Sequence, residues 1–188
     1  MNLPNKLTIL RIILIPIMIA VFYVPQIPYN YTISAGIFAL AAFTDFLDGY
    51  IARKYNLVTD LGKFLDPIAD KILVLVAFVI MLTKPEIFSG YGDVLGTISA
   101  GVGVSIIVAR EMTVSVLRMI AATKNKVLAA EGVGKIKTFA TDLAIIFLLV
   151  GVDFSAFFHV GFALYVLAVA LTVYSGVFYL IKNKDVFN

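Results

Sequence analysis

Four aspartates in two pairs are the residues of this chain best suited to chemistry. Asp45 and Asp48 are three residues apart, Asp66 and Asp70 are four residues apart, and both pairs lie in strongly apolar segments. On a helix, these spacings place the two carboxylates of a pair on one face. A carboxylate at the centre of a bilayer costs roughly 2.5–3.5 kcal/mol. We therefore interpret the cluster as a functional site whose charge is neutralised by bound cations.

The other metal-binding residue types narrow the choice of ion. The chain has no cysteine and a single histidine, His159, far along the sequence, so a metal at the aspartates would be held by oxygen. Oxygen ligands suit Mg²⁺ or Mn²⁺, and the sequence does not distinguish the two. Four carboxylates could hold two ions about 3.5–4 Å apart, which clamp both oxygens of an in-line phosphoryl displacement.

The composition predicts an integral membrane protein. Of the 188 residues, 61% are hydrophobic, whereas soluble domains are about 45–50% apolar. We expect one all-α domain over residues 1–188, with six transmembrane helices and a polar cavity that faces the cytoplasm. The six apolar segments, each near the ~20 residues of a helical span, cover residues 7–24, 32–53, 62–83, 94–118, 136–152 and 156–181.

The basic residues indicate the orientation of this bundle. Twelve of the fifteen fall on one side of the predicted spans, namely Lys6, Arg11, Arg53, Lys54, Lys63, Arg118, Lys124, Lys126, Lys135, Lys137, Lys182 and Lys184. The positive-inside rule then places both termini in the cytoplasm, as for a multi-pass protein of the cell membrane. The aspartates lie near the same cytoplasmic surface. Because the basic residues flank apolar segments, we expect no nucleic-acid partner.

The residues between the two pairs suit a phosphate-bearing ligand. Gly49 and Gly62 lack side chains, so a bulky ligand could approach the backbone closely. Ala52 keeps the helix face low, Arg53 offers a planar fork that matches phosphate, and Thr59 is suited to cap the third span. The alternative is that the aspartates merely pair with neighbouring basic residues, which would not explain both glycines.

The full pattern is Asp-x2-Asp-Gly-x2-Ala-Arg-x8-Gly-x3-Asp-x3-Asp, and every fixed position is matched between Asp45 and Asp70. It resembles the signature of the CDP-alcohol phosphotransferases. That resemblance implies that the four aspartates bind a pair of divalent ions and that Asp70 is also the general base. It implies further that Gly49, Ala52 and Arg53, together with Gly62, border the CDP group. It also suggests a homodimer.

A third group of polar residues lies near the N-terminus. Asn5, Thr8 and Arg11 recur every three residues and share one helical face. They could be a helix cap with ordinary interfacial anchors, or a second wall of the nucleotide site. The segment resembles the N-terminal stretch of one branch of the family, the bacterial phosphatidylglycerophosphate synthases, which favours the second interpretation. Asn5 and Thr8 are therefore candidate CDP contacts, as is Thr59.

The acceptor site is predicted from basic residues further along. Arg110 and Arg118 are eight residues apart, so one face of the fourth span carries both, and Lys135 approaches from the same side. Such a cluster suits an acceptor that bears its own phosphate and argues against choline or ethanolamine. Glu111 could simply pair with a neighbouring arginine. We interpret Lys137 as a positive-inside residue that meets anionic lipid.

Together with the resemblance, these features predict an enzyme that transfers a phosphatidyl group from CDP-diacylglycerol to glycerol 3-phosphate. The products would be phosphatidylglycerophosphate and CMP. Alternative acceptors are phosphatidylglycerol and inositol phosphate. A different class remains open, a divalent-cation or proton-coupled transporter, since intramembrane carboxylates also line ion pathways. Transporter sites usually lie at the midplane between internal repeats, and the sequence shows no repeat.

Overall fold

The computed structural model describes residues 3–55, 60–88, 93–124 and 132–184. Within these ranges it describes all side chains except those of residues 3, 4, 52, 53, 60–67, 70, 93–95, 97, 122 and 133. The described ranges contain no strand. Their six long helices are α1 (Leu3–Tyr23), α2 (Asn30–Lys54), α3 (Asp60–Leu82), α4 (Asp93–Thr123), α5 (Gly132–Asp153) and α6 (Phe158–Lys182). Two short 3-10 helices, η1 (Pro85–Ile87) and η3 (Ser155–Phe157), lie in the connections.

Each of the six predicted apolar segments forms one of these helices, so the all-α prediction is confirmed. Three boundaries differ from the prediction by four or more residues. Helix α1 begins at Leu3, before the predicted start at residue 7. Helix α4 continues to Thr123, past the predicted end at residue 118, and α5 begins at Gly132, before the predicted start at residue 136. Hydropathy finds only the apolar part of a helix, whereas polar residues such as Lys135 extend a helix readily.

Four helices in the described ranges are long and apolar enough to cross a membrane, so the chain is a multi-pass membrane protein. They are Asn5–Tyr23, Asn30–Ile51, Ile98–Ala121 and Ser155–Lys182. In α3 the apolar stretch found among the described side chains is Lys71–Leu82. Helix α5 is interrupted by several charged residues. The count of six spans therefore stays a prediction.

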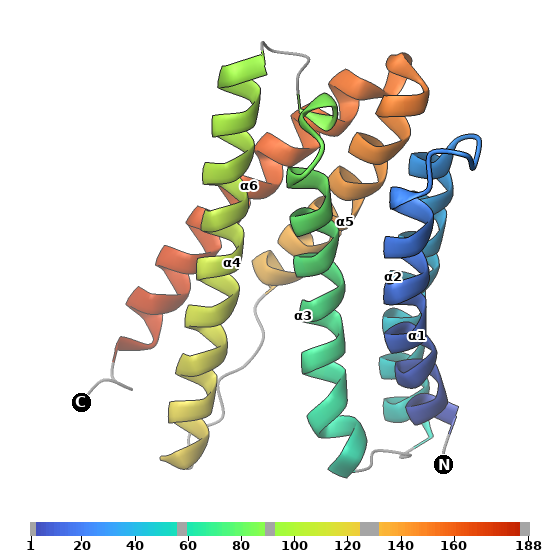
Figure 1. The fold of residues 1–188 in the computed structure, drawn as a ribbon. Helices are drawn as coiled ribbons and strands as arrows, with labels where there is room; N and C mark the ends of the chain where they lie inside the picture. Colours follow the sequence, from blue (N-terminus) through green and yellow to red (C-terminus); the bar gives the residue numbers. More distant parts are fainter. Residues whose placement is uncertain (1–2, 56–59, 89–92, 125–131, 185–188) are drawn as a thin grey trace.

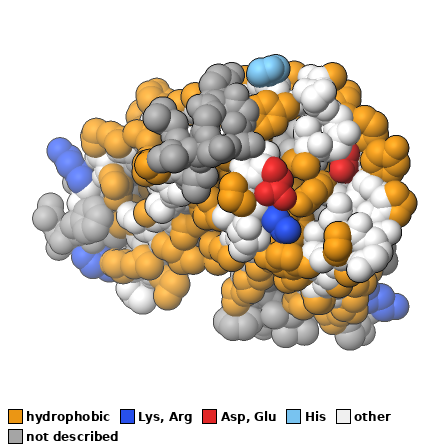
Figure 2. All heavy atoms as spheres, turned by 45° about the horizontal axis from the view of Figure 1, so that its top comes forward, with side chains coloured by type: hydrophobic (Ala, Val, Ile, Leu, Met, Phe, Trp, Pro, Cys, Tyr) orange, Lys and Arg blue, Asp and Glu red, His pale blue; other side chains and the backbone are white. Residues whose placement is uncertain are grey.

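Apolar side chains form both the core and much of the surface. In Figure 1, α1 and α2 run side by side in opposite directions, α5 and α6 form a tilted hairpin, and both termini lie in the lower half of the view. The face drawn in Figure 2 is covered mainly by hydrophobic side chains. Phe46 and Met119 are 67% and 68% exposed, as expected for contact with acyl chains. The core includes Met18, Phe22, Phe38, Phe78, Met81, Ile107, Ile145 and Leu148.

One end of the bundle is held by hydrogen bonds between its connections. Asp153, the last residue of α5, accepts hydrogen bonds from the backbone N–H of Thr32 at 2.8 Å and from the Thr32 hydroxyl at 2.6 Å. Tyr31 donates to Glu86 of η1 at 3.0 Å. These contacts fix the start of α2. Asp48 lies near the other end of the same helix.

The crossing of α5 and α6 depends on a glycine. A Cβ at Gly161 would lie 2.6 Å from the backbone nitrogen of Leu148 and 2.7 Å from the backbone carbonyl carbon of Phe147, whereas a Cβ at Gly36 would meet nothing within 4 Å. We expect Gly161→Ala to lower the free energy of unfolding by about 1–3 kcal/mol, because backbone cannot yield as a side chain can. Thermal unfolding in detergent, with Gly36→Ala as the control, would measure this. Equal stability of the two variants would contradict the packing described here.

Candidate active site

A buried arginine from α1 bridges the first aspartate pair. Arg11 Nη1 lies 2.8 Å from Asp45 Oδ1, and Arg11 Nη2 donates to Asp48 Oδ2 at 2.5 Å. The arginine side chain is 0% exposed, that of Asp48 is 3% exposed and that of Asp45 is 37% exposed. The planar fork of a guanidinium can reach two carboxylates that are one helical turn apart. Helices α1 and α2 are thus joined by charge as well as by apolar packing.

The predicted N-terminal face is confirmed and is turned inward. Asn5 and Thr8 are 7% and 0% exposed, and the Thr8 hydroxyl donates to Asp48 Oδ2 at 3.5 Å. Such burial argues against interfacial anchors in contact with water. Asn5, Thr8 and Arg11 form one buried face of α1, and Thr8 and Arg11 of this face contact Asp48. The aspartates thus pair with Arg11 of α1. The pairing alternative considered basic residues close to the motif in sequence instead.

The second aspartate pair lies only partly within the described structure. Asp66 and Asp70 belong to α3 and are four residues apart, so their backbone positions share a helical face. Their side chains, with those of Ala52 and Arg53, are outside the description. Thr59 is outside the described residues altogether. Among the side chains that are described, no three His, Cys, Asp or Glu residues gather as a metal site.

The chemistry of the described donor set fits a hard divalent cation. The oxygens of Asp45 and Asp48 converge on one positive group, the Arg11 guanidinium. No thiolate ligand exists in the chain, since it lacks cysteine. Carboxylate oxygens that already converge on a cation are the ligands that Mg²⁺ and Mn²⁺ prefer.

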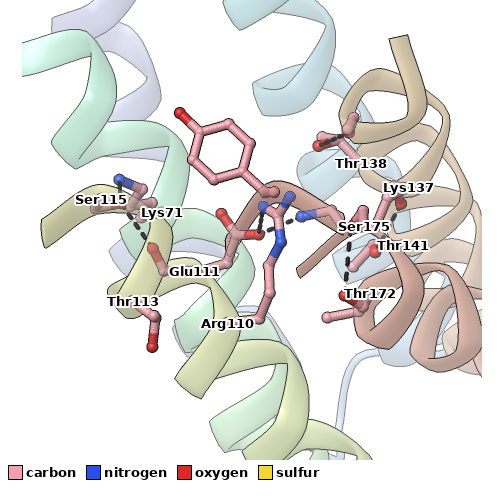
Figure 3. A network of polar contacts seen from close by, with 12 residues as sticks. Lys71, Arg110, Glu111, Thr113, Ser115, Lys137, Thr138, Thr141, Thr172 and Ser175 are labelled. Atoms are coloured by element: carbon pink, nitrogen blue, oxygen red, sulfur yellow. Dashed lines mark hydrogen bonds and ion pairs between the residues drawn. The ribbon is translucent and has the colours of Figure 1, made fainter. Parts of the chain in front are cut away.

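A second charged cluster joins α4 to α5, as Figure 3 shows. Glu111 Oε1 accepts a hydrogen bond from Arg110 Nη1 at 3.0 Å and another from Lys137 Nζ. The Lys137 side chain is only 5% exposed. The interpretation of Lys137 as a lipid-facing residue is therefore wrong, because its ammonium turns inward to a carboxylate. The expected pairing of Glu111 with a neighbouring arginine is confirmed.

The predicted shared face of Arg110 and Arg118 is confirmed, and it is turned toward α6. The Arg110 stem packs on Gly176, where an added Cβ would lie 3.0 Å from Arg110 Cγ. Arg118 Nε donates to the Tyr179 hydroxyl at 3.2 Å, and its guanidinium lies 5.5 Å from the centre of that ring. Lys135 is exposed in the first turns of α5. The structure thus brings Lys137, rather than Lys135, up to Arg110 through Glu111.

A small cavity adjoins this cluster between α3, α4 and α5. Its volume is about 40 Å³, room for water or a small ion rather than for a lipid headgroup. Lys71, in its wall, donates to the Ser115 hydroxyl. The charged lining residues are Lys71, Glu111, Lys137 and Asp142, and the apolar ones include Phe78 and Ile107.

Comparison with known proteins identifies the family. The profile of the CDP-alcohol phosphatidyltransferases matches residues 1–174. The chain belongs to this family. It is 39% identical to the CDP-diacylglycerol–glycerol-3-phosphate 3-phosphatidyltransferase of Bacillus subtilis (strain 168), over 98% of this chain and 96% of that protein. The enzyme of the same name from Rickettsia bellii (strain RML369-C) is also 39% identical, over 99% and 97%. The cardiolipin synthase (CMP-forming) of Oryza sativa subsp. japonica is 41% identical over 97% of this chain and 57% of that protein.

Family membership confirms the prediction of an enzyme, a CDP-alcohol phosphatidyltransferase, and leaves the transporter alternative without support. The match covers α1 to most of α6, so it includes both charged clusters. Both clusters therefore lie within the matched region. The metal, the nucleotide contacts and the acceptor contacts stay predictions.

The bridge made by Arg11 gives a direct test of this site. Arg11→Gln would leave the nearly buried Asp48 without its arginine, and breaking a buried ion pair typically costs about 3–5 kcal/mol. We expect a large fall in the thermal unfolding temperature in detergent with a chelator present, and a partial recovery when Mg²⁺ or Mn²⁺ is added. Lys6→Gln, which removes an exposed cation of the same helix, is the control. Equal stability of the two variants in chelator would contradict the bridge.

Proposed function

We propose that this chain transfers a phosphatidyl group from CDP-diacylglycerol to the hydroxyl of glycerol 3-phosphate, with release of CMP. The observation that carries the proposal is the convergence of Asp45 and Asp48 at the start of a complete family motif. The substrates come from the names of relatives that match over nearly the whole chain. The cytidine diphosphate would lie at the aspartates, and the acyl chains would lie in lipid.

The donor half would be built by α1, α2 and α3. Two divalent ions, Mg²⁺ or Mn²⁺, would be held by the four aspartates Asp45, Asp48, Asp66 and Asp70. When bound, such ions neutralise the negative charge of the diphosphate and of the departing CMP. The CDP group would be bordered by two sets of residues. The first set is the buried α1 residues Asn5 and Thr8. The second set lies in or between the aspartate pairs and comprises Gly49, Ala52, Arg53, Thr59 and Gly62.

The chemical step needs a base, because an alcohol is a weak nucleophile at neutral pH. Asp70 would accept the proton of the acceptor hydroxyl as its oxygen attacks the phosphorus of the phosphatidyl group. The new P–O bond joins the acceptor to that phosphorus. The bond from the same phosphorus to the oxygen that bridges the diphosphate breaks, and CMP leaves with the electron pair.

The acceptor half would be built by Arg110, Arg118 and Lys135. Arg110 supports this role best, because its buried Nε makes no hydrogen bond within the described part of the chain. A buried donor without a partner is unfavourable by about 1–3 kcal/mol, and a phosphate oxygen would satisfy it. A phosphorylated acceptor therefore fits better than an amine.

The membrane arrangement completes the proposal. All six helices would cross the bilayer, with the polar cavity and both termini on the cytoplasmic side of the cell membrane. Support comes from the even number of long helices, from the termini in the same half of Figure 1, and from the basic residues at that end. The enzyme would act as a homodimer, as the family resemblance suggests.

A panel of acceptors tests the substrate. Purified protein in detergent would receive CDP-diacylglycerol, Mg²⁺ or Mn²⁺, and labelled glycerol 3-phosphate, phosphatidylglycerol or inositol phosphate. We expect glycerol 3-phosphate to be consumed with one CMP released per lipid product, because the relatives that match end to end bear that name. The similarity to a cardiolipin synthase makes phosphatidylglycerol the second candidate. Consumption of either other acceptor in its place would overturn the proposed substrate.

A second experiment tests the base and the metal. Asp70→Asn keeps the size of the side chain but removes its ability to take a proton, so we expect turnover to fall by at least ~10²–10⁴-fold. The unfolding temperature should remain close to that of the wild type in chelator. Chelation of divalent ions should also abolish CMP release by the wild type. Turnover that survives either change would rule out the mechanism.

A further inference from the structure

One carboxylate in α4 has no role in the proposed transfer, yet it organises the acceptor cluster. Glu111 lies within the apolar segment Ile98–Ala121. Its Oε1 atom alone accepts hydrogen bonds from Arg110 Nη1 and Lys137 Nζ, as the dashed lines of Figure 3 show. Charge-assisted hydrogen bonds of this kind are roughly twice as strong as neutral ones. A single oxygen thus fixes two cations from two helices.

Packing alone does not explain this cluster. The side chains of Arg110, Glu111 and Lys137 are 15%, 25% and 5% exposed. Removing such charges from water is unfavourable, and apolar residues of similar size often stabilise a protein as well or better. Ionisable residues inside a membrane protein are therefore functional candidates in their own right. Two cations against one carboxylate leave a net positive charge of one, which favours a further anion.

The way Glu111 holds Arg110 determines which edge of the guanidinium is available. The carboxylate takes Nη1, while the buried Nε makes no hydrogen bond in the part of the chain described. The edge formed by Nε and Nη2 is one of the two edges through which a guanidinium binds phosphate with parallel hydrogen bonds. A Cβ added at Gly134 would lie 4.0 Å from Nη2, an ordinary van der Waals distance, so the first turn of α5 adjoins this edge.

The stem of Arg110 is held independently of its head. A Cβ added at Gly176 of α6 would lie 3.0 Å from Arg110 Cγ and 3.9 Å from Arg110 Cβ, so the stem lies directly on the α6 backbone. Held at the stem by Gly176 and at Nη1 by Glu111, the guanidinium has little freedom to rotate. Such prior ordering reduces the entropy lost when a ligand binds.

We propose that Glu111 is a positioning residue for the acceptor: it holds Arg110 by Nη1, braced by Lys137, so that the Nε–Nη2 edge meets the phosphate of the acceptor. The inference rests on the proposed function, because it requires an acceptor that carries a phosphate. It adds Glu111 and Lys137 to the acceptor half. It also assigns the phosphate to one edge of Arg110.

The sign of the effect separates positioning from charge. If Glu111 acted only through its negative charge, its removal would strengthen anion binding and lower the KM for glycerol 3-phosphate. Positioning predicts the opposite, a KM that rises. Glu111→Ala should raise this KM about tenfold, since a hydrogen bond to a charged group is worth that much or more. Glu111→Gln keeps a weaker acceptor atom and should give a smaller rise. The KM for CDP-diacylglycerol should be unchanged in both.

The experiment is a steady-state analysis of purified wild type, Glu111→Gln and Glu111→Ala, repeated in an Arg110→Lys background. Lysine has no planar fork, so the Glu111 substitutions should change the KM by less than about twofold there. Glu86→Gln, a glutamate of η1 that pairs with Tyr31, is the matched control. Unfolding temperatures identify any variant that fails to fold, and Glu111→Gln, which keeps the size of the side chain, then decides the question.

The outcomes distinguish the two proposals. Wild-type protein that consumes no phosphorylated acceptor would overturn the proposed function and this inference together. Wild-type protein that consumes glycerol 3-phosphate, with a KM that Glu111→Gln lowers or leaves unchanged, would overturn the inference alone. An equal rise of the KM in the Arg110→Lys background would also overturn it, because the effect would then not pass through Arg110.

Discussion

The need to neutralise buried carboxylates determines much of this molecule. Asp48 is almost fully buried, and the Arg11 guanidinium that bridges it to Asp45 is completely so. An isolated charge in such a place would be prohibitively unfavourable. The arginine lies on α1 and the aspartates on α2, so the folding of the first hairpin brings the opposite charges together. That hairpin, held at its other end by Asp153 and Thr32, provides a fixed wall for the donor half of the site.

The proposed acceptor half also pairs buried charges, but with the signs reversed. There a single carboxylate, Glu111, lies between two cations, Arg110 and Lys137, and joins α4 to α5. Each proposed half thus contains a protein group with the same sign of charge as its ligand. Arg11 lies among the aspartates that would bind divalent cations, and Glu111 lies among the basic residues that would bind a phosphate. The apolar core between the hairpins keeps the two halves at fixed positions. The proposed reaction transfers a phosphatidyl group from a diphosphate to a phosphorylated alcohol. Because both substrates are anions, both halves need positive charge, which divalent ions would supply at the aspartates and basic side chains at the acceptor.

Hydrophobic segments and one dense motif allowed much of this to be predicted from sequence. The apolar segments predict helices reliably, because apolar surface can be buried against any apolar neighbour. The motif Asp45–Asp70 indicates the family. The partners were harder to predict. The positive-inside rule places Arg11 among the cytoplasmic basic residues, although its three-residue spacing from Thr8 indicates the shared face. The same rule assigns Lys137 to lipid, although Lys137, like Arg110, lies inside a predicted span. Positive-inside statistics describe where cations gather and not which way a side chain turns.

The presence of two ions among the four aspartates can be measured directly by electron paramagnetic resonance of protein loaded with Mn²⁺. Two ions held about 3.5–4 Å apart should give a spin-coupled spectrum at two Mn²⁺ per chain. Asp48→Asn should weaken this binding and abolish the coupling. A spectrum of isolated ions at saturation, or coupled ions that Asp48→Asn leaves unchanged, would show that these carboxylates do not form the proposed site.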